Sequence, residues 1–193
     1  MNIYKNSTLA ALCLGFSVQA GVAGPIVDLA TQAEKRVEVG DTAGALGVAS
    51  DLVAQIWDAS NDIGIRDTLL VSEPAAAFGL YNPRPDNKYK SGEPVYVYAE
   101  PFGFAYGSGG EGLYTINFAF DLRVISSKGE LMGEVTDVAA LDLTSRYKLR
   151  EFQANLTYSL AGIPAGIYIL ETTLRDKNSN KTGTFQNEIE LTE

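Results

Sequence analysis

Histidine and cysteine are almost missing from this sequence of 193 residues, which has no histidine and a single cysteine, Cys13. Without them there is no Ser-His triad, no Cys-His nucleophile and no His/Cys site for zinc or haem. Carboxylate catalysis, a Ser-Lys pair and an oxygen-ligated metal remain possible. None of the many carboxylates forms an arrangement that stands out, so we predict no catalytic residue, no metal ligand and no cofactor.

The first 23 residues predict a secretory signal peptide. Lys5 precedes a mostly apolar stretch over residues 9–16, and small residues at Ala20 and Ala23 offer two cleavage positions. The apolar stretch is shorter than the roughly 17–25 residues of a membrane-spanning helix. We expect cleavage after Ala20 or Ala23, export to the periplasm or the medium, and no stable membrane insertion afterwards.

Cleavage would also remove Cys13, which lies too early in the apolar stretch for a lipid-modified cleavage site. The remaining chain of about 170 residues would then have no disulfide. Small secreted domains depend on disulfides when their core is too small, but a chain of this length can bury a self-sufficient core. This pattern favours a bacterial exported protein.

The net charge of −9 excludes one class of partner. Nucleic acid requires a basic footprint, and an acidic exported chain does not supply one. The simplest interpretation of the charge is that it keeps the protein soluble.

Residues 24–62 predict a helical hairpin. Pro25 suits a first helical position, Gly40 interrupts the pattern, and Asp41 can cap a second helix. Apolar residues recur at helical spacing on both sides of this break, ending at Trp57. The hairpin resembles one tetratricopeptide-type helix pair. Such a unit is not stable alone, so we expect it to pack on the β domain or on a partner.

From residue 63 to the end, the apolar pattern changes to a period of two. Residues 114–124 and 152–160 alternate between apolar and polar side chains, which is typical of antiparallel strands with one buried face. About seven short strands separated by turns predict an antiparallel β-sandwich rather than a βαβ fold.

The segment from Leu160 to Tyr168 resembles the corner before the penultimate strand of immunoglobulin-like and fibronectin type III-like domains, as found in bacterial exported proteins of uncharacterised function. The resemblance implies that the Tyr168 hydroxyl hydrogen-bonds back across the corner. It also implies seven strands, near 76–81, 94–101, 112–125, 131–139, 152–160, 166–175 and 183–191. Three loops, at residues 101–111, 142–150 and 176–181, would then gather at one end of the sandwich.

The loop over residues 101–111 is the first candidate for a binding site. Phe102, Phe104 and Tyr106 stand at alternate positions and are followed by glycines. Exposed aromatic side chains on loops are common in recognition surfaces. Alternatively, Phe102 and Phe104 extend the preceding strand and pack on the helical hairpin.

A local basic patch lies on one of the neighbouring loops. Arg146, Tyr147, Lys148 and Arg150 would lie near the aromatic loop if the expected topology holds. Alternatively, they are ordinary solvated surface residues. Together with the aromatic loop, they would make a site for an anionic or sugar-like ligand.

The loop over residues 176–181 shows the alternating oxygen spacing of a calcium loop. Lys181 and Asn187 occupy the positions where an EF-hand needs glycine and a bidentate glutamate. We therefore expect a polar hairpin turn, with a weak calcium site as the alternative.

The sequence thus favours an exported, non-catalytic binding or assembly module of the bacterial cell envelope. Its partner would be a protein or a cell-envelope polymer. One alternative is a carbohydrate-binding domain that uses the aromatic loop over residues 101–111. Another is a carboxylate-dependent hydrolase.

Overall fold

The computed structural model describes residues 24–193, and the predicted signal peptide lies outside them. The chain divides into two compact units, one ending at Ala49 and one from Ser50 to Glu193. Within residues 24–193, no helix is both long and apolar enough to cross a membrane.

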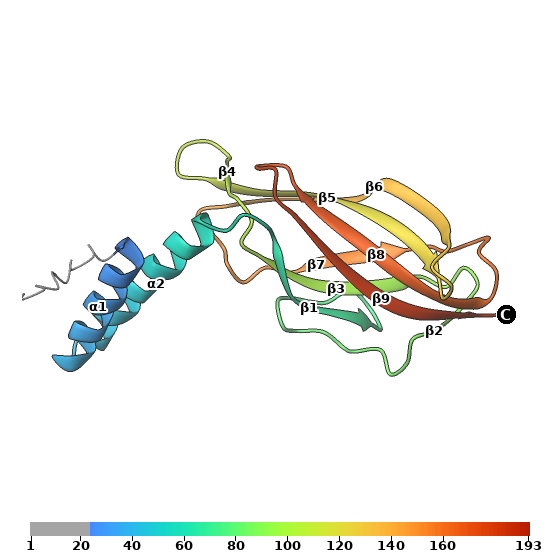
Figure 1. Cartoon of the computed structure of the whole chain (residues 1–193), viewed down its shortest axis with the longest axis horizontal. Coiled ribbons are helices and arrows are strands. Elements are labelled where there is room, and N and C mark those ends of the chain that lie inside the picture. Colours follow the sequence, from blue (N-terminus) through green and yellow to red (C-terminus); the bar gives the residue numbers. More distant parts are fainter. Residues whose placement is uncertain (1–23) are drawn as a thin grey trace, which may run out of the picture. The chain divides into compact units, whose positions relative to one another are not determined.

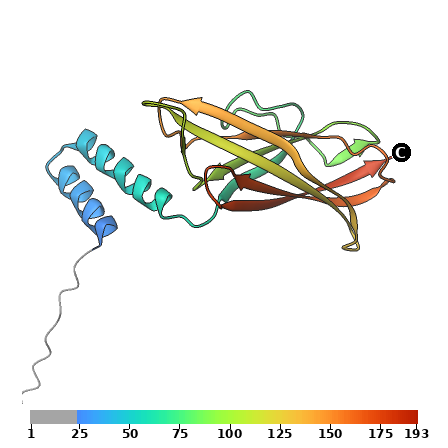
Figure 2. The ribbon, with the colours of Figure 1, turned by 90° about the horizontal axis from the view of Figure 1, so that it is seen from above.

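Two helices, α1 (Pro25–Glu38) and α2 (Thr42–Asp58), confirm the predicted helical segments. They run antiparallel where they meet at the connecting turn (Figure 2). Gly40 takes a φ of 79°, a left-handed conformation that suits glycine. Asp41 then caps α2, because its Oδ1 accepts the N–H of Gly44 at 2.9 Å. This hydrogen bond, together with the Arg36 guanidinium, lowers the pKa of Asp41.

Within residues 24–193, nine strands form two facing sheets (Figure 1). They are β1 (Gly64–Val71), β2 (Lys88–Lys90), β3 (Val95–Phe102), β4 (Gly107–Ser108), β5 (Tyr114–Ser126), β6 (Leu131–Ser145), β7 (Ala154–Tyr158), β8 (Gly166–Asp176) and β9 (Thr182–Thr192). The smaller sheet has the order β1-β3-β7. In the larger sheet the order is β2-β9-β8-β5, and β4 pairs with the start of β5. Strand β6 pairs with the opposite edge of β5 and with no other strand of residues 24–193. Among the strands of residues 24–193, only β2 and β9 pair in parallel.

The mainly-β, sandwich-like fold is therefore confirmed, but the count of seven strands is wrong. Residues 76–81 are not a strand, because Leu80 N–H bonds to the Ala77 carbonyl and Gly79 has a φ of 69°, which together make a tight turn. The first strand of the smaller sheet is instead β1. Strands β2 and β4 are too short to show an alternating pattern.

Strand β6 runs to Ser145 and not to residue 139, because a bulge shifts its pattern. Ala139 lies opposite Phe120 and Val135 lies opposite Leu122, so residues 136–138 face the single residue between them, Asp121. Within the bulge Asp137 has a φ of 54°, and its N–H donates to the Asp121 carboxylate at 2.9 Å. Because the alternation of apolar residues changes phase at the bulge, the sequence pattern does not predict the second half of the strand.

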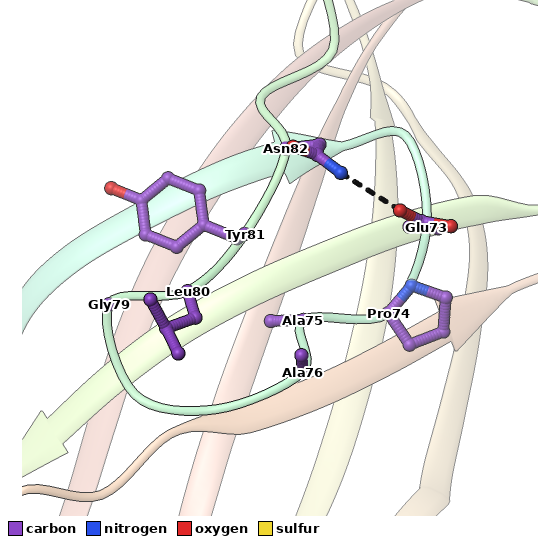
Figure 3. Close-up of a pocket in the computed structure, with 8 residues that line it drawn as sticks. All are labelled: Glu73, Pro74, Ala75, Ala76, Gly79, Leu80, Tyr81 and Asn82. Atoms are coloured by element: carbon purple, nitrogen blue, oxygen red, sulfur yellow. Dashed lines mark hydrogen bonds between the residues drawn. The ribbon is translucent and has the colours of Figure 1, made fainter.

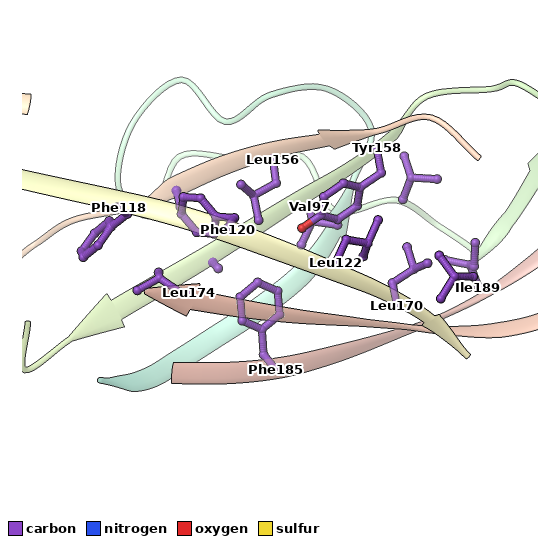
Figure 4. Close-up of a cluster of buried hydrophobic side chains, with 14 of the residues drawn as sticks. Val97, Phe118, Phe120, Leu122, Leu156, Tyr158, Leu170, Leu174, Phe185 and Ile189 are labelled. Carbon is purple, nitrogen blue, oxygen red and sulfur yellow. The ribbon is translucent and has the colours of Figure 1, made fainter. Parts of the chain in front are cut away.

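The core fills the space between the sheets without any disulfide (Figure 4). Side chains from both sheets meet there and are buried: Val97, Leu156 and Tyr158 from the smaller sheet, and Phe118, Phe120, Leu122, Leu170, Leu174, Phe185 and Ile189 from the larger. Each large apolar side chain contributes roughly 1.5–3 kcal/mol on burial. The Tyr158 hydroxyl is satisfied by the hydroxyl of Thr172 at 2.8 Å.

The corner before β8 has the expected hydrogen bond. The Tyr168 hydroxyl donates to the Pro164 carbonyl oxygen at 2.9 Å. This contact fixes the turn over residues 160–166 to the strand that follows it.

Candidate ligand-binding site

One end of the sandwich brings together three loops, which confirms the prediction that they gather. The Asp176 carboxylate, at the end of β8, accepts the N–H of Ala105 at 2.7 Å. The Tyr106 hydroxyl donates to the Leu149 carbonyl oxygen at 2.7 Å. The connection between β3 and β5 is therefore tied to both neighbouring loops.

The backbone that follows β3 is fixed by side chains from distant segments. Gly103, with a φ of 79°, turns the chain inward, and its carbonyl oxygen accepts a hydrogen bond from Lys181 Nζ at 2.7 Å. The next carbonyl oxygen, of Phe104, accepts the indole N–H of Trp57 at 2.6 Å. The loop is thus held in one conformation up to Tyr106.

Phe104 is part of the core. Its ring is fully buried and makes edge contacts with Trp57, Phe118 and Phe152 at centroid distances of 5.1, 5.3 and 5.7 Å. This placement leaves Phe104 no surface for contact with a ligand. Phe102, the last residue of β3, is 40% exposed, and its ring lies against Gly64.

A recess of about 380 Å³ lies beside Tyr106. Tyr106 and Tyr114 form one wall, with their ring centroids 6.5 Å apart in an edge arrangement. Lys148 Nζ lies 5.4 Å from the Tyr106 centroid and 5.9 Å from the Tyr114 centroid, within the range of cation–π attraction. The remaining wall is small residues and backbone: Gly107, Ser108, Gly110, Gly112 and Leu113.

Tyr106 is held rigidly at the back of this recess. Trp57 stacks on its far side at 6.3 Å, with 24° between the ring planes. Burial raises the pKa of Tyr106 to about 12, so the hydroxyl keeps its proton at neutral pH and donates to the Leu149 carbonyl. The Lys148 ammonium also lies 3.8 Å from Asp58, a weak, exposed ion pair that leaves it available to a ligand.

Gly107 allows close packing at the base of the recess. A Cβ at this position would collide with the side chains of Asn178 and Thr115. The Asn178 amide in turn donates to the Thr115 carbonyl oxygen at 3.2 Å. At this position glycine serves close approach rather than mobility.

The predicted site residues therefore divide into two groups. Tyr106 and Lys148 line the recess, whereas Arg146 and Tyr147 are exposed and do not. Tyr114, which the alternating pattern had placed on the buried face of its strand, lines the recess and is 37% exposed, because it is the first residue of β5. For Trp57, the sequence pattern indicates only that it ends an apolar helical row.

A second recess of about 530 Å³ lies under the connection between β1 and β2 (Figure 3). The Asn82 amide donates to the Glu73 carboxylate at 2.9 Å, and Tyr81 packs on Tyr98 with a centroid distance of 4.5 Å. All its lining residues come from the segment 73–82, and Glu73 is their only ionisable carboxylate. It offers less chemistry than the tyrosine–lysine recess.

The loop at the end of β8 is a polar turn. Asp176 is 4% exposed, and its carboxylate accepts hydrogen bonds from the N–H groups of Ala105 and Asn178 and from the Ser179 hydroxyl. These donors occupy the oxygens that a calcium ion would need. Within residues 24–193, no group of three or more Asp, Glu, Cys or His side chains is placed to hold a metal ion.

No protein-family model matches this chain, and no curated protein matches it. Among solved structures, the sporulation control protein Spo0M from Bacillus subtilis is 14% identical, with a TM-score of 0.34. A family 123 glycoside hydrolase from Clostridium perfringens is 10% identical, with a TM-score of 0.36. The alignments cover 69% and 67% of this chain but only 51% and 27% of those proteins, and neither bears on the activity of this one.

Proposed function

We propose that this protein is an exported, non-catalytic binding module of the bacterial cell envelope, and that it binds an anionic, sugar-like polymer at the tyrosine–lysine recess. One observation carries the proposal: Lys148 Nζ lies within 6 Å of the ring centroids of both Tyr106 and Tyr114, and all three residues line one recess. Aromatic faces bind the apolar C–H faces of sugar rings, and an ammonium group binds a carboxylate or phosphate.

The composition of the recess supports binding rather than catalysis. None of its lining residues is a carboxylate, whereas hydrolysis of a glycosidic bond requires two of them across a cleft. A backbone wall made largely of glycine leaves room for a polymer to pass along the surface.

Two further features support export and the immunoglobulin-like assignment. The pattern over residues 1–23 is typical of a signal peptide, and the chain that follows contains no cysteine. Two observations fit the immunoglobulin-like arrangement: the Tyr168 corner, and the separation of β1, β3 and β7 from β5, β8 and β9. Strand β6, which is the fourth strand of the expected seven, departs from it, because it pairs with β5 instead of joining the smaller sheet.

Calorimetric titration with an oligomer of uronic acid, and with its neutral counterpart, tests the proposal. We expect the acidic oligomer to bind and the neutral one to bind at least about tenfold more weakly, because the ammonium would have no partner. Tyr114→Ala and Lys148→Met should each weaken binding by about tenfold or more. Tyr147→Ala, which removes a ring that is 75% exposed and outside the recess, is the matched control.

The proposal is wrong if neither oligomer binds, or if both recess variants bind the acidic oligomer as the wild type does. A variant that binds poorly must still unfold at the same urea concentration as the wild type. Otherwise its weak binding would result from a destabilised fold and not from the loss of a contact with the ligand.

A further inference from the structure

The two long sides of the sandwich differ in how they are closed. On one side β1 and β9 join the sheets: Ile63 N–H donates to the Thr182 carbonyl oxygen at 2.9 Å, and the Thr68 hydroxyl donates to Asn187 Oδ1 at 3.3 Å. On the other side, in the part of the chain that the structure describes, β6 pairs only with β5 and β7 only with β3. Both strands therefore present a free edge there, and the gap between these edges is here called the β6–β7 seam.

Two recesses open along the β6–β7 seam. The smaller, of about 160 Å³, has apolar walls: Leu122, Val124, Val135, Val138, Leu160 and Ile163. The larger, of about 390 Å³, lies beside the second half of β6 and is lined by Leu141, Leu143, Leu149 and Phe152, with Asp142 and Glu151 among the polar residues. Apolar side chains thus stay accessible from outside along the length of β6.

Strand β6 lacks two of the residue types that commonly protect free edges. It contains 15 residues without lysine or proline, and Leu131, Met132, Val135 and Leu143 are exposed on it. Natural edge strands are commonly protected by charged side chains, especially lysine, by proline, by short length or by a bulge. From Ala139 to Ser145 the only charged residue of β6 is Asp142. The bulge at residues 136–138 interrupts the edge, and the register shifts again between Leu131 and Gly133, but from Ala139 to Ser145 the pairing with β5 is regular.

We propose that an extended segment of a partner protein pairs with β6 along residues 139–145 and inserts its alternate apolar side chains into the β6–β7 seam. An added strand would satisfy the outward-facing N–H and C=O groups of β6. Because side chains alternate in a strand, every second one would point into the recess beside Leu141 and Leu143, and the others would face solvent.

Charge identifies the kind of segment. Glu134, Asp142 and Glu151 line the two recesses, and no lysine or arginine does. The outward-facing positions of the partner segment should therefore carry lysine or arginine. A second copy of this chain fits poorly, since its own net charge is −9 and its free edge carries the same acidic residues.

Three synthetic peptides of about nine residues, long enough to span roughly 30 Å when extended, test this proposal. The first alternates valine with lysine, the second has the same composition with the valines contiguous, and the third replaces each lysine with glutamate. Fluorescence anisotropy with the full chain should show binding of the first peptide at least about tenfold tighter than the other two, weakening as salt is added. Among residues 139–145, exchange of the amides that point away from β5 should slow when the first peptide is bound.

A pair of variants separates the β6–β7 seam from the rest of the surface. Leu143→Lys places a cation in the larger recess and should weaken binding of the first peptide by about tenfold or more. Ile167→Lys is the matched control, because Ile167 is also an exposed apolar strand residue but lines neither recess. Both positions are partly exposed already, so both variants should fold.

Three results would each overturn the proposal. They are no binding of the alternating peptide, binding by Leu143→Lys as tight as by the wild type, and slow exchange, before any peptide is added, of those amides among residues 139–145 that point away from β5. If that slow exchange depends on protein concentration, the occupant is a second copy, and if it does not, the occupant is a segment of the same chain.

Discussion

Trp57 donates its indole N–H to the carbonyl oxygen of Phe104 at 2.6 Å, and the two rings meet edge to face at 5.1 Å. One residue in the last turn of α2 thereby fixes the backbone of a loop 47 positions away and supports Tyr106 from behind. The aromatic wall of the recess depends on this contact.

Trp57→Ala should lower the free energy of unfolding by about 3–5 kcal/mol, because it removes a large buried side chain. Trp57→Phe keeps a ring but leaves the Phe104 carbonyl without its donor, and should cost about 1–3 kcal/mol. Urea denaturation must be followed by circular dichroism, since Trp57 is the only tryptophan. A Trp57→Phe variant as stable as the wild type would show that the hydrogen bond contributes nothing.

Tyr168→Phe tests the corner before β8. The change removes only the hydroxyl that donates to the Pro164 carbonyl, so the expected loss is about 1 kcal/mol. Tyr147→Phe removes an exposed hydroxyl and should leave the urea midpoint unchanged. Equal midpoints for the two variants would contradict a stabilising role for the corner.

Gly107→Ala should destabilise the pairing of β4 with β5. The added methyl group would collide with Asn178 and Thr115, which hold the base of the recess. A loss of about 1–3 kcal/mol is expected, as for other overpacked positions. Gly133→Ala is the control, because a Cβ there meets nothing within 4 Å. The two variants are compared by thermal denaturation, and equal melting temperatures would contradict the steric argument.

Local patterns in the sequence predicted the parts of the fold that depend on neighbouring residues. Helical spacing and two punctuating residues, Gly40 and Asp41, located both helices. Alternation located β5 and β7 to within a few residues, because one face of each strand is buried, and the resemblance gave the ranges of β8 and β9. The sequence around Tyr168 predicted a hydrogen bond that the structure contains.

Features that depend on distant partners could not be predicted in this way. Phe104 and Tyr106 belong to the same row of alternate aromatic residues, yet Phe104 is buried and Tyr106 lines a recess. The difference arises from Trp57 and Asp176, which turn the loop inward and lie far away in the sequence. Tyr114 was placed on a buried face because the alternation does not show where burial ends along the strand.

Acid should destabilise the protein through carboxylates on the outer face of the larger sheet. Hydrogen bonds from Arg175 hold the pKa of Asp121 below its usual value, and hydrogen bonds from Gln186 and Arg123 do the same for Glu171. Their contribution is present above the unfolded-state pKa values, about 3.9 for Asp and 4.3 for Glu, and is lost as pH falls through the lower folded-state values. The urea concentration at the midpoint of unfolding should therefore decrease when the pH is lowered below about 4.

Asp121→Asn is the variant that assigns this acid sensitivity. It removes a carboxyl group whose pKa is lowered in the folded state. The urea midpoint of this variant should therefore differ less between pH 7 and pH 3 than that of the wild type. Identical pH dependence in the two proteins would mean that Asp121 does not contribute.

Alkali should destabilise the protein through buried tyrosines. Burial raises the pKa of Tyr158, Tyr89 and Tyr98 to about 12, and the nearby Glu100 carboxylate adds to the effect on Tyr98. A raised folded-state pKa means that the stabilisation is complete below the unfolded-state value of about 10 and is lost as pH rises from there toward 12. Absorbance of tyrosinate should therefore rise in two phases, with the buried tyrosines ionising only as the sheet structure disappears from the circular dichroism spectrum. Tyr158→Phe should reduce the late absorbance phase, and ionisation of all tyrosines in a single phase near pH 10 with the sheets intact would contradict the burial of these hydroxyls.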